Sequence, residues 1–442
     1  MLTLNFTLRQ HSPLIHFQPD MGGATLRATE LKPKLDNYVI SMMGGIDVVS
    51  KNYSNWLIPG QKSFDYKIKI SATPSRHEVI MPGVDNQPPF FFGNIGDEYK
   101  RNPNKYLNFS DTPIKVSIRT FNNHIVSNES LLDFIRSVLP SFFLSVNFGT
   151  RQSKGYGSFY LHEKDPLYED PEDRIAFQND GNGDFLPYSI TLRTNGRDTF
   201  ERSIDALKRL EVFYKAMRSG INRCYGRNQH YLKSLLWLYF KRIVDNNIKW
   251  EKKKIKEQLL GRQPETLRQT AVHSGKPGYE ESPLGSGGSH ELLIKDMFGL
   301  ASEETWDAKY DRFKIEKIIE DVDRFKSPIF FKLLMRGDHF KIFFHAHELT
   351  TENSVIGRMV EINKTLRIRT PSVFDFHSFF DYLSNADAFN LDNHFIVHTN
   401  NEETNSSDYQ TVSAMKKSGR REFERIDNYK ILKGIISELQ SH

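Results

Sequence analysis

The sequence predicts an α+β protein made of two ferredoxin-like (βαββαβ, RRM-like) domains in tandem, the second with a large helical insertion. Residues 1–163 alternate between strand-like and helix-like patterns in the order strand, helix, strand, strand, helix, strand, which is the ferredoxin-like order. A similar order can be followed through residues 185–442. A chain of 442 residues is also too long for one ordinary core, so two domains are expected.

The elements of the first domain follow from residue periodicity and from the positions of proline. Alternation of apolar and polar residues predicts strands at 2–8, 66–70, 114–118 and 159–161. The first helix is expected to start near Pro33, because proline is tolerated in a first turn but not in a helix interior. The second helix, over 129–139, is expected to stop before Pro140.

Residues 164–184 are acidic and contain proline and glycine, so they are expected to form an exposed linker. The second domain, 185–442, is expected to contain a helical insertion at about 199–260 and then a mobile loop at 261–289, which is poor in apolar residues. Its remaining segments predict strands at 188–192, 324–332, 340–345 and 394–398, and helices at 375–383 and 421–439.

Composition limits the class of protein. The net charge is only +5, so an anionic partner must be met by a local basic patch. The single cysteine, Cys224, excludes a disulfide framework and a cysteine-based zinc site. The first residues read as a strand and no run of about 18 apolar residues occurs. We therefore expect a soluble cytoplasmic protein with no membrane contact, no metal and no cofactor.

The segment 149–159, with sequence GTRQSKGYGSF, is the main candidate binding site. Glycines at 149, 155 and 157 permit a backbone whose N–H groups form a nest for phosphate oxygens, and Arg151 and Lys154 supply positive charge. The spacing is neither that of a Walker A motif nor that of a Rossmann turn, so a longer phosphodiester fits better than a nucleotide cofactor. The alternative is a glycine-rich hairpin loop with two solvated cations.

Other cations cluster near predicted helices. Arg27, Lys32 and Lys34 surround the start of the first helix, where an anion is already favoured. A secondary basic patch is expected from Lys208, Arg209, Lys252, Lys253, Arg324 and Lys326. The alternative for the basic run of the helical insertion is an ordinary solvated face.

These pieces together resemble the RAMP superfamily of CRISPR type III effector subunits. The segments 12–14, 23–29 and 31–35 look like the opening of the first-numbered subunit of type III-B (Cmr) complexes. The segment 149–159 looks like the RAMP glycine-rich loop. The segments 297–299 and 324–332 look like the later Phe-Gly and Arg-x-x-Ser-Pro elements of that subunit, in the expected order.

The resemblance implies a non-catalytic subunit at the end of the effector filament. It would lie near the 3′ region of the guide RNA, beside other RAMP subunits, and contact guide and target RNA. Matching by position makes the expected RNA-binding residues Arg27, Lys32, Lys34, Gly149, Arg151, Lys154, Gly155 and Gly157. It also places Arg324, Lys326 and Lys332 beside the second Ser-Pro element.

Two other functions stay open at this stage. His11 and His16 follow the first strand, where related transcript-processing endoribonucleases place a general acid or base, so a metal-independent endoribonuclease is the enzyme alternative. A phage or host interaction protein with a borrowed fold is the third. The apolar triplet 90–92 is either a partner-docking wedge or core. His345 and His347 share a strand face but lack a third metal ligand.

Overall fold

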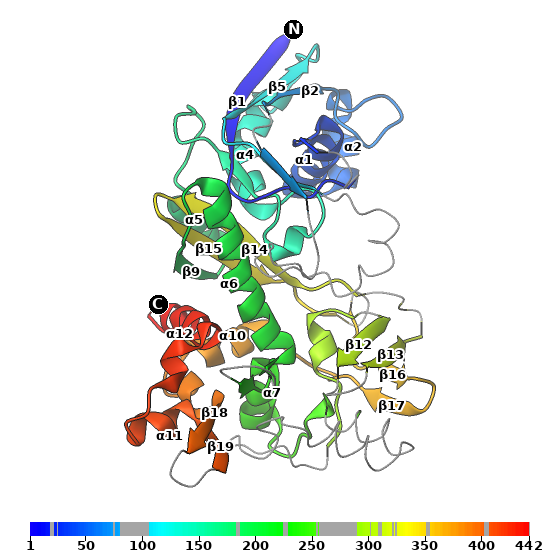
Figure 1. The fold of residues 1–442 in the computed structure, drawn as a ribbon. Coiled ribbons are helices and arrows are strands. Elements are labelled where there is room, and N and C mark those ends of the chain that lie inside the picture. The colour runs from blue at the N-terminus through cyan, green and yellow to red at the C-terminus, as the bar shows by residue number, and fades with distance from the viewer. Residues whose placement is uncertain are drawn as a thin grey trace. The chain divides into compact units, whose positions relative to one another are not determined.

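The structure of the chain is a computed structural model. It describes residues 1–17, 22–23, 25–73, 76–79, 106–182, 186–223, 229–252, 255, 290–300, 302–307, 312–320, 322, 325–350, 354–401 and 406–441. The chain forms two compact units (Figure 1): unit 1 comprises Met1–Lys208 and Phe330–His345, and unit 2 comprises Arg209–Ile329 and Ala346–His442. The predicted triplet 90–92 and loop 261–289 lie outside the described residues.

Unit 1 contains a four-stranded antiparallel sheet in the order β2-β5-β1-β8 (Figure 1). Its strands are β1 (Leu2–Gln10), β2 (Lys67–Ser71), β5 (Ile114–Thr120) and β8 (Phe159–Leu161). The helices α1 (Ala28–Met42) and α4 (Leu131–Ser145) follow β1 and β5 along the chain. A short helix α2 (Ile46–Asn52), the pair β3 (Arg76–Val79) and β4 (Tyr106–Phe109), and the pair β6 (Ile125–Val126) and β7 (Glu129–Ser130) are added. The predicted order of the main elements is therefore present.

The core of unit 1 follows from the two periodicities. Leu4, Phe6 and Leu8 alternate along β1 and are all buried. In the register of the sheet, Phe6 lies opposite Val116 and Leu4 opposite Ile118. Leu31, Leu35 and Val39, spaced by four residues on α1, and Ile135, Leu139 and Phe142 of α4 belong to the same buried cluster.

Both helix boundaries predicted from proline are wrong. The helix α1 begins at Ala28 and contains Pro33, and α4 runs through Pro140 to Ser145. Proline in a helix interior removes one hydrogen bond and costs about 3 kcal/mol. In α4 the residues beyond Pro140, including Phe142 and Phe143, are fully buried, and that burial outweighs the lost bond.

Unit 1 also includes elements that were expected in the linker or in the second domain. The helix α5 (Pro171–Asn182) occupies the predicted linker. The strand β9 (Tyr188–Arg193) pairs with β15 (His339–Ala346), which forms a three-stranded sheet with β14 (Ile329–Arg336). The division of the chain into compact units thus differs from the expected boundary at 163 and 185.

Unit 2 contains two four-stranded sheets. One has the order β10-β11-β18-β19, from Ile221–Arg223, His230–Leu232, Ile396–Asn401 and Ser406–Thr411. The other has the order β12-β13-β16-β17, from Glu303–Asp307, Arg312–Ile318, Met359–Ile362 and Leu366–Arg369. Its helices include the second half of α6 (Thr199–Ser219), α7 (Leu235–Tyr239), α10 (Phe376–Ser384), α11 (Val412–Lys417) and α12 (Asp427–Leu439).

The second βαββαβ order is not confirmed. Strand β18 pairs with β11 and β19, whereas β9 and β15 pair in a separate sheet. The helical insertion expected at about 199–260 is interrupted: residues 230–232 are a strand, and α7 is five residues long and is followed by a π-helix, Phe240–Val244. The apolar run at 235–240 is buried all round, so it lacked the one-sided pattern that marks a surface helix.

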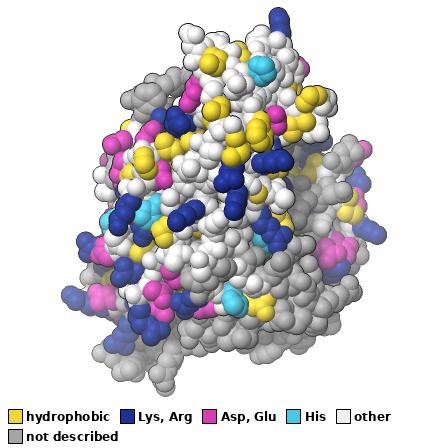
Figure 2. Space-filling model, turned by 90° about the horizontal axis from the view of Figure 1, so that it is seen from above, with side chains coloured by type: hydrophobic (Ala, Val, Ile, Leu, Met, Phe, Trp, Pro, Cys, Tyr) yellow, Lys and Arg dark blue, Asp and Glu magenta, His cyan; other side chains and the backbone are white. Residues whose placement is uncertain are grey.

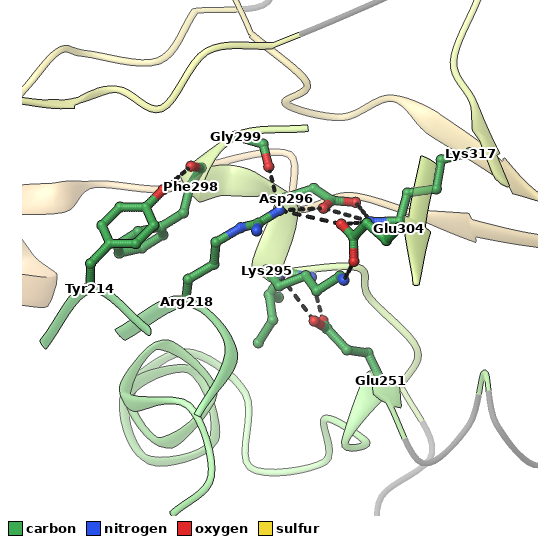
Figure 3. Close-up of polar contacts among 10 residues, drawn as sticks. Tyr214, Arg218, Glu251, Lys295, Asp296, Phe298, Gly299, Glu304 and Lys317 are labelled. Carbon is green, nitrogen blue, oxygen red and sulfur yellow. Dashed lines mark hydrogen bonds and ion pairs between the residues drawn. The ribbon is translucent and has the colours of Figure 1, made fainter. Parts of the chain in front are cut away.

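A buried network of charged side chains lies inside unit 2 (Figure 3). Lys317 Nζ lies 2.8 and 2.9 Å from the two carboxylate oxygens of Asp296 and 2.9 Å from Glu304 Oε1, and the Lys317 and Asp296 side chains are fully buried. Arg218 donates to the carbonyl of Gly299 and lies 3.3 Å from Glu304, and Lys295 also pairs with Glu304. Pairing of this kind is what makes buried charge tolerable.

The Glu251 carboxylate borders this network and accepts hydrogen bonds from the backbone N–H groups of Ile294 at 2.6 Å and Lys295 at 3.2 Å. Burial raises the pKa of Glu251 from 4.5 to about 7, because the desolvation of the charged form outweighs the two donors and the nearby Lys295. The next residue, Lys252, is affected in the opposite direction: burial and the charge of Lys295 lower its pKa to about 7.

We predict that Glu251 makes stability pH-dependent between about pH 4.5 and 7. In this range the folded protein holds a proton that the unfolded chain has released, so the free energy of unfolding falls as pH rises, by about 3 kcal/mol at 1.36 kcal/mol per pKa unit. The Glu251→Gln variant keeps an acceptor oxygen for one of the two N–H groups, which donate to different oxygens of Glu251, and it cannot ionise. Its stability relative to wild type should rise with pH across this range in urea unfolding experiments. Parallel pH profiles for the two proteins would contradict the assignment, and the exposed Glu422→Gln serves as the control.

Candidate nucleic-acid interface

The first turns of α1 lie against the glycine-rich loop, although the contacting residues are more than 110 positions apart in sequence. The carboxylate of Glu30 accepts a hydrogen bond from the backbone N–H of Gly149 at 2.6 Å. The Lys34 ammonium donates to the carbonyl of Asn147 at 2.5 Å and to Gln152 Oε1 at 2.8 Å. Two of the segments singled out in the sequence are therefore joined directly.

The tip of the loop has a strained backbone. Arg151 adopts the left-handed conformation, with φ 61° and ψ 27°, and a 3₁₀ turn over Gln152–Lys154 then leads to Gly155, which is left-handed too. For a residue with a side chain this conformation costs roughly 1–2 kcal/mol. Such strain tends to gather at functional sites, and it sets the direction in which the Arg151 side chain leaves the loop.

At both ends of the loop the expected open nest of backbone N–H groups is replaced by internal hydrogen bonds, and this is a correction. The N–H groups of the loop donate to the protein itself: Thr150 to the carbonyl of Ile15 at 2.7 Å, Gly157 to the carbonyl of Pro13 at 2.8 Å and Ser158 to Ser12 Oγ at 2.9 Å. With Gly149 bonded to Glu30, these donors are satisfied internally. These four N–H groups are therefore not available to an anion.

The glycines serve close packing within the chain. A Cβ on Gly157, which has φ 66°, would lie 1.9 Å from the carbonyl oxygen of Phe148, and one on Gly149 would lie 2.3 Å from that of Ile15. Gly155 and Gly157 are buried, and so is Lys154. The expectation that these three residues face a ligand is therefore replaced by a structural role, because the second half of the loop is packed inside unit 1.

Strand β14 braces the loop from within unit 1. Lys332 is fully buried and donates to the carbonyls of Val146 and Phe159, both at 2.9 Å. The hydroxyl of Ser158 donates to the carbonyl of Leu333 at 2.7 Å. Burial, with the charge of Lys34, lowers the pKa of Lys332 well below its usual range. The sequence placed Lys332 only beside a Ser-Pro element, since its partners lie far away along the chain.

Lys32 and Lys34 are half-buried and bound to internal acceptors. The Lys32 ammonium lies 2.9 Å from Asp36 and from Ser63 Oγ, 2.8 Å from the carbonyl of Phe64, and over the ring of Tyr66. Burial lowers the pKa of Lys34, an effect that Glu30 partly offsets. Both lysines thus position the loops around α1. The sequence showed only a cluster of cations and did not indicate these contacts.

Arg27 and Arg151 are half-exposed and flank the junction of helix and loop. Arg27 is the residue before the first turn of α1 and leaves its cap without a side-chain hydrogen bond. Arg151 lies between Gly149 and Gln152, the two loop residues that α1 contacts. Of the predicted RNA-binding residues, these two are the arginines, and both side chains are half-exposed beside the junction.

The secondary basic patch is only partly described. Lys208 and Arg209 are half-buried on α6, and Lys326 is exposed. Lys252 is half-buried and donates to the carbonyl of Ser219. Lys253 and Arg324 lie outside the described residues. On the face drawn in Figure 2, Lys and Arg side chains adjoin hydrophobic and acidic ones and form no single-sign surface.

The histidines of the enzyme alternative are buried. His11 is 4% exposed, its Nδ1 accepts a hydrogen bond from the backbone N–H of Met335 at 2.9 Å, and burial lowers its pKa well below the usual value. His16 is 3% exposed. Among the described residues no group of three His, Cys, Asp or Glu side chains is arranged to hold a metal ion. In the same part of the chain, no helix combines the length and apolarity needed to cross a bilayer.

Comparison with known protein families gives two matches, one after the other along the chain. Residues 1–221 match the model of the Cmr1 N-terminal domain, and residues 231–407 match that of the Cmr1 C-terminal domain. The chain therefore belongs to the Cmr1 family. It is accordingly a subunit of a type III-B CRISPR effector complex. No curated protein gives a significant sequence match.

Solved structures of the family show only distant likeness. Cmr1 from Pyrococcus furiosus in its apo form is 12% identical, with 80% of this chain and 90% of that chain covered and a TM-score of 0.28. A chain of the Type III-B Cmr-beta complex bound to cognate target RNA and AMPPnP is 12% identical, with 78% and 94% covered and a TM-score of 0.35. A chain of Cmr-beta bound to cognate target RNA is 11% identical, with 80% and 97% covered and a TM-score of 0.35.

We predict that Gly157→Ala destabilises unit 1 by about 3 kcal/mol, as the sum of left-handed strain and the displacement of the Phe148 backbone. Gly337→Ala is the matched control, because Gly337 also has positive φ, 58°, but a Cβ there meets nothing within 4 Å. It should cost only about 1–2 kcal/mol. Equal losses in denaturant unfolding would show that close packing is not what requires the glycine at 157.

Proposed function

We propose that this chain is a non-catalytic RNA-binding subunit that caps a type III-B effector filament near the 3′ region of the guide RNA. Its partners would be the CRISPR guide RNA, the target RNA and other RAMP subunits of the Cmr complex. The observation that carries the proposal is the direct junction of α1 with the glycine loop, which holds Arg27 and Arg151 on adjoining segments. Membership of the Cmr1 family supports the assembly into which this subunit would fit.

In this proposal the two arginines grip the phosphate backbone. A guanidinium presents several N–H donors in a planar fork that suits phosphate oxygens, and such contacts position a strand without reading its sequence. Because the N–H groups of Gly149, Thr150, Gly157 and Ser158 are bonded within the protein, the proposed grip relies on the two arginine side chains. Lys32 and Lys34 contribute by holding the surrounding loops, and Lys154, Gly155 and Gly157 by building the interior of the loop.

We also propose that unit 1 is a ferredoxin-like domain. The support is its βαββαβ element order together with the pairing of its four main strands, in the order β2-β5-β1-β8, in one antiparallel sheet. The burial of His11 and His16 gives no support to a general acid or base reaching a 2′-hydroxyl, so the endoribonuclease alternative is not proposed.

We predict that the double charge reversal Arg27→Glu/Arg151→Glu lowers single-stranded RNA affinity by about 2 kcal/mol or more, roughly 30-fold, if each arginine contacts a phosphate. The slope of log affinity against log salt should also become shallower, by about 0.7 for each phosphate that the variant no longer neutralises. Fluorescence anisotropy with a labelled guide-length RNA at several salt concentrations measures both quantities. The expected decrease in affinity should be similar for unrelated sequences.

The control is Lys417→Glu/Arg425→Glu, which makes the same change of net charge at two exposed residues of unit 2. Its effect should be small. If both double variants weaken binding equally, the RNA senses only total charge and the proposed site is wrong. Unchanged affinity in the arginine variant would remove these residues from the interface.

We further predict that the purified chain leaves CRISPR repeat RNA intact in the presence of EDTA, since the two candidate histidines are buried and His11 accepts a backbone hydrogen bond. Denaturing gel electrophoresis over several hours measures the outcome. Cleavage that disappears in His11→Ala or His16→Ala would contradict the non-catalytic assignment.

A further inference from the structure

Unit 1 contains a hollow of about 770 Å³ that neither the sequence analysis nor the proposed phosphate grip uses. Its walls come mainly from the loop over residues 54–65, which follows α2, and from the loop over residues 121–124, which follows β5. The hollow is open to solvent along one side, and its lining mixes polar side chains with one large aromatic ring, Phe121.

The two walls are tied together before any ligand arrives. The indole N–H of the buried Trp56 donates to the carbonyl of His124 at 3.0 Å, and the Asn122 amide donates to the carbonyl of Asn55 at 2.5 Å. The hydroxyl of Thr120 donates to the carbonyl of Asp65 at 2.5 Å. These bonds join residues that lie 55 to 68 positions apart along the chain. The hollow is thus preformed, which lowers the entropic cost of binding.

Phe121 is the unusual side chain of this hollow. It is 82% exposed, whereas phenylalanines such as Phe6 of β1 and Phe142 of α4 are buried in the core of unit 1. A large ring held in water by a fixed loop has no role in the core of unit 1. An exposed ring beside a hollow is the arrangement on which unpaired nucleobases stack.

The rest of the lining matches the edge of a base better than an apolar anchor. Gln61 and Asn123 present exposed amides, and Ser50 and Ser54 present exposed hydroxyls, so donors and acceptors are both available. The lining contains one cation, Lys62, and one carboxylate, Asp65, so their formal charges cancel. A protein hot spot usually inserts into an apolar, dry pocket, which this lining does not form.

We infer that this hollow binds one unpaired nucleotide of a single-stranded RNA, with the base stacked on Phe121, its edge facing Gln61 and Asn123, and Lys62 beside its phosphate. The inference rests on the proposed RNA-binding function and adds a base-contacting site to the phosphate grip. Ser63, in the same loop as Lys62, accepts a hydrogen bond from Lys32 of α1, so the hollow and the start of α1 belong to one connected framework.

The test compares three variants of the full chain in RNA-binding measurements. Phe121→Ala should reduce affinity for single-stranded RNA by about 5- to 160-fold, the range for the removal of one base–aromatic stack. The salt slope should stay unchanged, because no phosphate contact is removed. Phe121→Trp should retain the affinity, and its fluorescence should be quenched when RNA binds. Ile125→Ala removes a neighbouring side chain that is 69% exposed and does not line the hollow, and it should have no effect.

The outcomes separate this inference from the proposed function. If wild type binds RNA and Phe121→Ala binds equally well with unchanged melting temperature, the nucleotide pocket is wrong while the phosphate grip stands. If Phe121→Ala and Ile125→Ala weaken binding equally, a general apolar surface replaces the pocket. If Phe121→Ala binds RNA normally but fails to enter the reconstituted Cmr complex, the hollow docks a protein subunit. If wild type does not bind single-stranded RNA at all, both proposals fall.

Discussion

The clamp on the glycine-rich loop is the constraint on which the rest of unit 1 depends. Glu30 and Lys34 hold the loop from α1, and Lys332 holds both of its ends from β14. The amino group of Lys332 is buried and donates to backbone carbonyls, and a buried polar group without such partners would be strongly unfavourable. The clamp therefore brings together three distant segments of the chain, with Arg151 at the tip of the loop.

Buried charged side chains organise unit 2, where cations are paired with carboxylates. There Lys317, Arg218 and Lys295 meet the carboxylates of Asp296 and Glu304, so each ion has a counter-ion within the same core. Networks of this kind seldom add net stability over a well-packed apolar core, but removing one member is costly. They consequently favour a single arrangement of the strands and turns that carry them.

Together these features describe a Cmr1-family subunit whose proposed binding surface is supported from inside. The cations that attract attention in the sequence mostly serve as internal ties, as Lys32 shows with its contacts to Asp36, Ser63 and Phe64. The proposed contacts with RNA are left to a few side chains at fixed positions, namely Arg27, Arg151 and the ring of Phe121. Preorganised side chains of this kind lose little entropy when a flexible strand binds.

Periodicity alone determined the first strand, the two main helices of unit 1 and their order, because burial of alternating or four-spaced apolar residues is a local property. Local patterns also located the glycine loop and the family resemblance. Tertiary structure decided the rest: α4 continues through Pro140 because the residues beyond it are buried, and β18, the expected last strand of the second βαββαβ unit, pairs with β11 and β19 instead of joining the sheet of β9 and β15. It likewise decided which cations are ties and which are exposed, since the acceptors that occupy Lys34 and Lys332 lie more than a hundred residues away along the chain.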